Sequence, residues 1–230
     1  PLPTKVKGDT VEFHVSLKAN EIKQIRISLA LAESEEQPNR LFAQTSVYRD
    51  VHAVSHGIKA SAEQWLKRET EFHSDSLLLN RVMRRSLMDL HMLKTSISGD
   101  EFFAAGVPWF VTLFGRDCLV TSLQTLAFWS DTPADTLRLL ARYQGTEVSG
   151  WRDEQPGKIL HELRVGELAR MNKIPHTPYY GTIDATPLFL ILMSRYSHWT
   201  GDLSLFEELR APVERALNWI DKYGDVAGDG

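Results

Sequence analysis

The sequence predicts a mainly α-helical protein that begins with the last strands of a β-domain. Hydrophobic residues alternate at every second position near the start and recur at helical spacing from about residue 61 onward. Three long segments rich in Gly, Pro, aromatic and charged residues separate the expected helices. We therefore expect residues 1–40 to be the end of a β-domain with its linker, and residues 41–230 to form a helical domain.

The strand prediction rests on two runs of alternating residues. In the first run, one face carries Val11, Phe13, Val15 and Leu17. The same alternation returns over residues 25–31, after a break at 19–21. Such runs are typical of strands with one buried face, and two strands alone do not make a stable sheet. They are therefore expected to close a larger β-domain, followed by a polar linker over residues 33–40.

The helix prediction rests on apolar spacing and on residues that favour helix starts. Ser61 is expected to cap one helix, and Thr132 another, with Pro133 in its first turn. Leu79 and Val82 belong to the apolar stripe that predicts a long helix. The expected helices after Ser61 cover residues 75–94, 118–129, 132–143, 160–170, 185–199 and 212–223.

Composition excludes several classes of function. Hydrophobic residues make up 43% of the chain, the formal net charge is -4, and no long basic run marks a nucleic-acid partner. No apolar run reaches the roughly 18 residues of a membrane span. Because Cys118 is the single cysteine, a disulfide within the chain and a cysteine-based zinc cluster are excluded, which favours a reducing compartment, the cytoplasm. Neither a metal nor a cofactor is expected. The chain starts without Met and stops in Gly-Asp-Gly, so we expect both ends to be cut.

The first motif covers residues 102–117 and ends in Phe-Gly-Arg-Asp. In one interpretation, Asp117 caps the following helix and pairs with Arg116. In the other, both side chains bind a terminal sugar, because guanidinium donors and carboxylate acceptors suit paired hydroxyls. Trp109 in the same motif offers an aromatic face of the kind that stacks on a pyranose ring.

The second motif covers residues 151–164 and places ionisable side chains around a Pro-Gly turn. Asp153 and Glu154 fit a solvated loop. His161 and Glu162 fit that interpretation less well, because the neighbouring Ile and Leu residues indicate burial. The His-Glu pair is not a metalloprotease motif, since the second His is missing.

The third motif covers residues 175–186, in which two prolines and a glycine indicate an extended loop. Asp184 stands where the next helix is expected to begin, so it either caps that helix or faces a pocket. Tyr179 and Tyr180 precede it with two aromatic rings.

Together, these motifs resemble bacterial proteins of the amylo-α-1,6-glucosidase (glycogen-debranching) family. The resemblance is carried by Gly-Val-Pro-Trp-Phe, Phe-Gly-Arg-Asp, Pro-Gly-Lys-Ile-Leu-His-Glu and Tyr-Tyr-Gly-Thr-Ile-Asp-Ala-Thr-Pro-Leu-Phe, in this order. It covers about residues 41–230 and implies that they are the first part of an (α/α)6 barrel of the six-hairpin glycosidase type. Cys118 departs from the small hydroxyl residue expected at its position.

The resemblance also implies a carbohydrate site. Arg116 and Asp117 resemble the pair with which related glucoamylases hold the terminal sugar. The implied substrate-binding residues are Trp109, Arg116, Asp117, His161, Glu162, Tyr179, Tyr180 and Asp184. We expect these loops to share one concave rim, and a piece of a barrel to leave a large apolar area uncovered.

An inverting glycosidase needs a general acid and a general base about 6.5–9.5 Å apart. The resemblance implies that both lie beyond Gly230. Two alternatives remain open: hydrolysis of another α-glycoside, such as trehalose, and a non-catalytic carbohydrate-binding toroid. The acidic end, residues 225–230, partly resembles a calcium loop, but Ala227 cannot supply a ligand.

Overall fold

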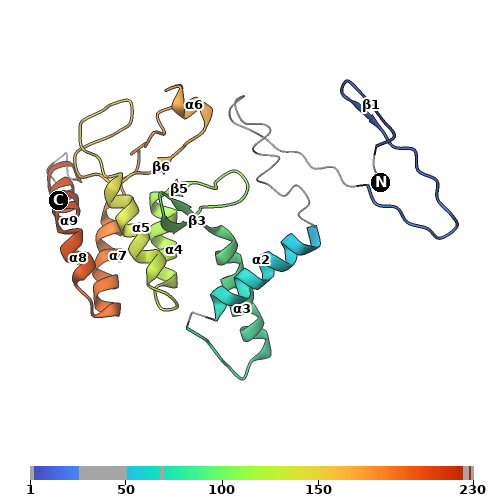
Figure 1. Cartoon of the computed structure of the whole chain (residues 1–230). Helices are drawn as coiled ribbons and strands as arrows, with labels where there is room; N and C mark the ends of the chain where they lie inside the picture. The colour runs from blue at the N-terminus through green and yellow to red at the C-terminus, as the bar shows by residue number, and fades with distance from the viewer. Residues whose placement is uncertain (1–2, 26–50, 68–69, 225–227, 229–230) are drawn as a thin grey trace. The chain divides into compact units, whose positions relative to one another are not determined.

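The computed structural model of the chain describes residues 3–25, 51–67, 70–224 and 228. The chain divides into two compact units, residues 1–58 and residues 59–230. The described residues are mainly helical, as the sequence predicts (Figure 1). Among them, no helix is both long and apolar enough to cross a membrane.

The first unit contains a short antiparallel hairpin of β1 (Lys5–Lys7) and β2 (Thr10–Glu12). The predicted strand over residues 11–17 therefore stops after two residues. Its predicted buried face is wrong as well, since Val11 and Leu17 are 49% and 59% exposed. The reason is that the described β1–β2 sheet has only two strands and no third strand is described beside it. Residues 26–31 of the second predicted strand lie outside the described residues.

The second unit is built on a group of helices that lie side by side in Figure 1. They are α4 (Gly115–Thr125), α5 (Asp131–Arg142), α7 (Ala185–Thr200) and α9 (Arg210–Trp219). Fully buried side chains between them include Leu119, Leu137, Leu140, Phe189 and Leu192. Full burial of a Leu or Phe side chain stabilises a fold by about 1.5–3 kcal/mol, so this layer holds the core of the unit.

Two further helices lead into a hairpin that packs beside this layer. They are α2 (Val51–Leu66) and α3 (Leu77–Leu93), where the Ser76 hydroxyl oxygen caps α3 by accepting from the N–H of Leu79 at 3.3 Å. β3 (Lys94–Ile97) follows directly and pairs antiparallel with β4 (Asp100–Phe103). The turn between them is Ser98-Gly99, both with positive φ, as a two-residue hairpin requires. β4 packs against α4 and α5.

Several helix predictions are confirmed and others are wrong. α3, α7 and α9 occupy the expected ranges, and α9 continues into a π-helical turn at Ile220–Gly224. Residues 160–170 do not form one helix, because β6 (Glu162–Leu163) pairs there with β5 (Leu113–Phe114) and only the short α6 (Glu167–Arg170) follows. The short helix α8 (Ser204–Glu208) was not predicted.

The predicted helix starts at Ser and Thr residues are also wrong. Ser61 lies inside α2, and Thr132 is the second residue of α5, whose N-cap is Ser130. Apolar spacing locates the helical stretch but leaves its first residue open by several positions.

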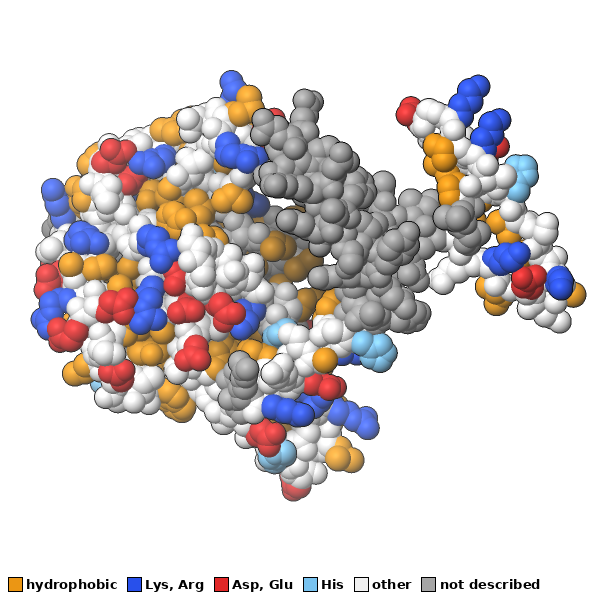
Figure 2. Space-filling model, viewed as in Figure 1, with side chains coloured by type: hydrophobic (Ala, Val, Ile, Leu, Met, Phe, Trp, Pro, Cys, Tyr) orange, Lys and Arg blue, Asp and Glu red, His pale blue; other side chains and the backbone are white. Residues whose placement is uncertain are grey.

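Apolar side chains remain at the surface of both units. Figure 2 shows hydrophobic side chains interspersed with charged ones on the viewed face. In α3 no residue is fully buried, although its apolar spacing predicts a core helix. Leu79 and Val82, which belong to its apolar stripe, are 41% and 51% exposed.

Candidate functional site

A backbone ladder joins the three motifs at the end of the helix layer where β5 and β6 lie (Figure 1). Phe114 of the first motif pairs with Glu162 of the second, and Glu162 forms a bridge with Tyr179 of the third. The N–H of Gly115 donates to the His161 carbonyl at 2.9 Å, and the N–H of Tyr179 donates to the Glu162 carbonyl at 2.9 Å. Segments that are far apart in the sequence therefore meet where α4 and α7 begin.

Gly115 makes this meeting sterically possible. A Cβ atom at Gly115 would collide with the carbonyl oxygen of Leu160 and lie 3.2 Å from the Cβ of Ala185. Only glycine leaves room for the backbones of the first and second motifs to approach this closely beside the start of α7.

Arg116 and Asp184 link the first turn of α4 to the start of α7. The Nη1 atom of Arg116 donates to Oδ2 of Asp184 at 3.2 Å, and the Arg116 side chain is 53% exposed. Asp184 stands at the N-cap position of α7, as predicted, but its carboxylate accepts from Arg116 and Thr182 instead of capping the helix. Partial burial alone would raise the pKa of Asp184, but the hydrogen bonds from Thr182 and Arg116 outweigh it, so this pKa lies below its ordinary value.

Asp117 lies at the third position of α4 and not at its N-cap, which is Phe114, so the capping interpretation is wrong. A carboxylate in the first turn is favoured by the helix dipole. Asp117 and Arg116 line a hollow of about 290 Å³, together with residues of α3, β4 and the following loop. In the part of the chain that the structure describes, nothing donates a hydrogen bond to the Asp117 carboxylate, which leaves it able to accept hydroxyl donors.

Glu162 lines a different hollow, of about 700 Å³. Its side chain is only 11% exposed, pairs with Arg164, and lies 3.8 Å from Nε2 of His176. Arg116 and Asp117 thus line one hollow and Glu162 another, so these two hollows do not bring the predicted residues onto one concave rim.

The aromatic residues of the predicted site differ in their surroundings. Trp109 is 78% exposed. The Tyr179 hydroxyl donates to Oδ2 of Asp153 at 3.2 Å, and the ring of His161 lies between those of Phe114 and Tyr179. Tyr180, by contrast, is a core residue.

Tyr180 is 3% exposed, and its hydroxyl donates to the Tyr143 carbonyl at 2.8 Å. Burial, and after it the nearby Glu154 carboxylate, raises the pKa of Tyr180, which keeps the phenol neutral. Its side chain belongs to the core and does not face the solvent, so in this structure it does not line a sugar pocket.

Sequence reasoning missed the role of Glu154 and of two side chains beside Glu162. Glu154 is 3% exposed, pairs with Arg152 and accepts from the N–H of Thr146 at 2.8 Å, so its interpretation as a solvated residue is wrong. Arg164 and His176 stood within the motifs. Arg164 is two residues after Glu162, the spacing that places side chains of an extended segment on one face, whereas no local pattern marked His176.

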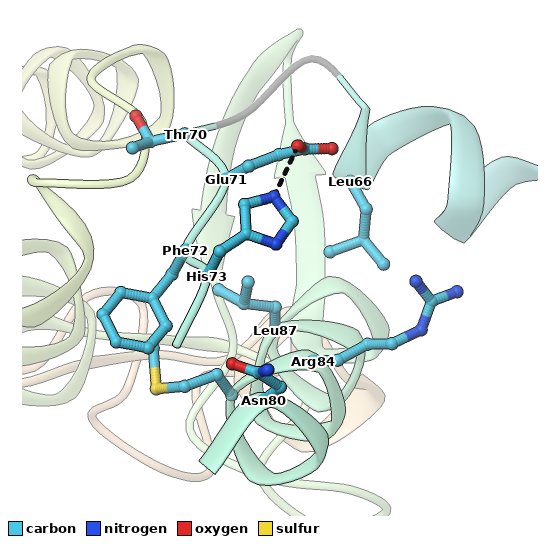
Figure 3. A pocket seen from close by; sticks show the side chains of 9 residues that line it. Leu66, Thr70, Glu71, Phe72, His73, Asn80, Arg84 and Leu87 are labelled. Carbon is cyan, nitrogen blue, oxygen red and sulfur yellow. Dashed lines mark hydrogen bonds and ion pairs between the residues drawn. The ribbon is translucent and has the colours of Figure 1, made fainter. Parts of the chain in front are cut away.

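A third hollow, of about 220 Å³, lies between the end of α2 and α3, away from the motifs (Figure 3). Its lining includes the His73–Glu71 pair, with Nε2 and Oε2 3.0 Å apart. Both side chains are more than two thirds exposed, and exposed pairs contribute about 0–1 kcal/mol, so this pair does not define a site.

Among the described residues, no group of three or more His, Cys, Asp or Glu side chains is placed to hold a metal ion. The acidic end of the chain, where the calcium-loop pattern stands, lies outside the described residues apart from Gly228. No protein-family model matches the chain, and no curated protein matches its sequence.

Proposed function

We propose that this chain is part of a glycoside hydrolase that cleaves α-glucosidic bonds, with α-1,6 branches of glycogen-type glucans as its substrate. The observation that supports this most directly is the convergence of the three motifs through the Phe114–Glu162–Tyr179 ladder and the Arg116–Asp184 pair. The resemblance of these motifs to the amylo-α-1,6-glucosidase family supplies the reaction class. In this proposal residues 41–230 are the first part of an (α/α)6 barrel.

The hollow beside α4 has the chemistry that a terminal glucosyl unit requires. Arg116 offers guanidinium donors, and the Asp117 carboxylate has acceptor capacity that no described side chain uses. Trp109 presents an exposed indole near the same end of the layer. Charged donors and acceptors fix the hydroxyls, and an aromatic face covers the apolar side of the ring.

None of these carboxylates is proposed as the general acid or base. A general acid needs a raised pKa, whereas hydrogen bonds from Thr182 and Arg116 hold the pKa of Asp184 below its ordinary value. We place the acid and base of the inverting mechanism beyond Gly230, and the enzyme in the cytoplasm, where the buried Cys118 thiol stays reduced.

The test uses a protein that contains these residues together with the helices proposed to follow them. It is incubated with a branched α-1,6 oligosaccharide, and NMR identifies the anomer that is released first. Release of β-glucose from the branch supports the proposal, because inversion converts an α-linkage into a β-product. Hydrolysis of trehalose alone would indicate another α-glycosidase. Binding without hydrolysis would indicate a carbohydrate-binding toroid, and a failure to bind any α-glycoside would overturn the proposal.

A further inference from the structure

Arg164 is in contact with all three motifs. Its Nη1 atom donates to the carbonyl oxygen of Trp109 at 3.0 Å, and its Nε atom pairs with the Glu162 carboxylate. Its own backbone N–H donates to the His176 carbonyl at 2.7 Å. The Arg164 side chain therefore holds the loop of the first motif by a hydrogen bond, and the Arg164 backbone donates a hydrogen bond to the third motif.

Two aromatic rings hold the guanidinium in place. Its Cζ atom lies 5.4 Å from the centre of the Phe114 ring and 6.0 Å from that of Phe110. The Arg164 side chain is 31% exposed, so these contacts are partly shielded from water. A planar guanidinium can donate along two directions and stack at once, which a lysine ammonium cannot reproduce.

The loop that Arg164 fastens carries the exposed indole. Gly106 and Phe110 exchange backbone hydrogen bonds at 3.2 and 3.0 Å, which closes a tight loop with Trp109 near its end. The Trp109 side chain points into solvent, and its carbonyl oxygen points to Arg164. The backbone that carries the exposed ring is thus held by a bond that comes from outside the loop.

We propose that Arg164 is a positioning residue for carbohydrate binding, which sets the orientation of Trp109 for stacking on a sugar ring of the bound α-glucan. This inference rests on the proposed function. Arg164 acts through Trp109, because its Nη1 atom donates to the Trp109 carbonyl oxygen and the guanidinium lies against the ring of the next residue, Phe110. Small displacements of a substrate-positioning group are enough to lower affinity or rate considerably.

A double-mutant cycle in the active enzyme tests this. Arg164→Lys and Trp109→Ala are each expected to raise KM for a branched α-glucan oligosaccharide about ten-fold, with kcat changed less than about two-fold. The double variant is expected to be no worse than either single one, because the position of an indole that is missing cannot matter. The control is Arg138→Lys, which alters another partly exposed arginine, paired with Glu208 away from the motifs, and should leave KM unchanged.

Each result decides the matter. Additive effects, or Arg164→Lys with the KM of the wild type, would overturn the inference and leave the proposed function intact. An Arg164→Lys protein without the native circular dichroism spectrum would assign Arg164 a purely structural role and also overturn it. Trp109→Ala removes an exposed side chain and should fold, so a normal KM in that variant overturns the inference independently. A wild-type protein that acts on no α-glycoside contradicts the proposed function itself.

Discussion

Asp117 lies in the first turn of α4, and no described side chain donates a hydrogen bond to its carboxylate. Its proposed role can therefore be tested by replacing the carboxylate with an amide. We expect Asp117→Asn to lower kcat/KM by about ten- to a few-hundred-fold in the active enzyme. A charge-assisted hydrogen bond contributes about 1.5–3 kcal/mol, and an amide also places a donor where the sugar presents donors. Steady-state kinetics on a branched α-glucan measures the change.

The matched control is the neighbouring residue. Cys118 is fully buried, and its thiol donates to the Gly115 carbonyl at 3.3 Å, a bond that a serine hydroxyl can also make. Cys118→Ser should therefore change kcat/KM only a few-fold. Because Asp117 does not cap α4, its substitution by Asn should not shift the helix start. A correctly folded Asp117→Asn enzyme with near-normal kcat/KM would show that this carboxylate does not bind the substrate.

The Arg116–Asp184 pair should make the free energy of unfolding depend on pH in the acid range. The pKa of Asp184 is lower in the folded state than the usual value near 3.9, so its contribution is present above that value and is lost as pH falls through the folded pKa. Between pH 7 and pH 3 the wild type should lose more unfolding free energy than Asp184→Asn does. The pair is partly exposed, so the difference should stay below about 1 kcal/mol.

Urea unfolding at a series of pH values measures this difference. The other carboxylates are common to both proteins and cancel in the comparison. Parallel curves for wild type and Asp184→Asn would show that the pair does not stabilise the fold.

The positions of the motif residues relative to the helices could be predicted from the sequence, whereas their side-chain contacts could not. The sequence indicated that Arg116, Asp117 and Asp184 stand at helix starts, because turn residues precede apolar stretches there. It did not show that Asp184 binds Arg116 instead of its own helix, or that Arg164 reaches Trp109. Those contacts depend on the register of β5 with β6, which residues far apart in the chain determine together.

At the scale of elements, Gly115 fixes the place where β5 becomes α4. Gly115→Ala should lower the free energy of unfolding by more than about 2 kcal/mol, because the added Cβ collides with the Leu160 backbone and crowds Ala185. Backbone atoms cannot move aside as a flexible side chain can. Chemical denaturation, followed by circular dichroism, measures the loss.

The control for Gly115 is a glycine with space around it. A Cβ at Gly150 would meet no heavy atom within 4 Å, and its φ does not lie in the left-handed region. Gly150→Ala should therefore be neutral or slightly stabilising. Equal stability of the two variants would mean that the first and second motifs are not held as closely as the structure has them.

Elements with long apolar periods could be predicted and short ones could not. α3 and α7 are each four or more turns long, so several apolar positions support the same prediction. β5 and β6 have two residues each, and their apolar residues fit the start of a helix equally well. These residues form strands and not helix because the two segments pair with each other. This pairing is a tertiary contact, which no local sequence pattern contains.

At the scale of the whole molecule, α3 differs from the helices of the core. Large apolar residues of α3 are more than 40% exposed in this structure: Leu77, Leu78, Leu79, Val82 and Met92. A helix with an apolar face is normally buried along that face. In the proposed barrel, helices beyond Gly230 would cover these side chains.

Two Leu→Ala substitutions compare the stability contribution of a buried helix with that of a helix whose apolar side chains are exposed. In the chain of residues 1–230, Leu119→Ala should cost about 2–5 kcal/mol of unfolding free energy, since Leu119 is fully buried in α4. Leu79→Ala removes the same atoms from a side chain that is 41% exposed and should cost less than about 1 kcal/mol. In a longer protein that contains the proposed remaining helices, the cost of Leu79→Ala should rise toward that of Leu119→Ala, because the side chain becomes buried. Urea denaturation of the four variants measures both costs. A Leu79→Ala cost that stays small in the longer protein would show that this face of α3 meets solvent there, and the closed barrel would have to be given up.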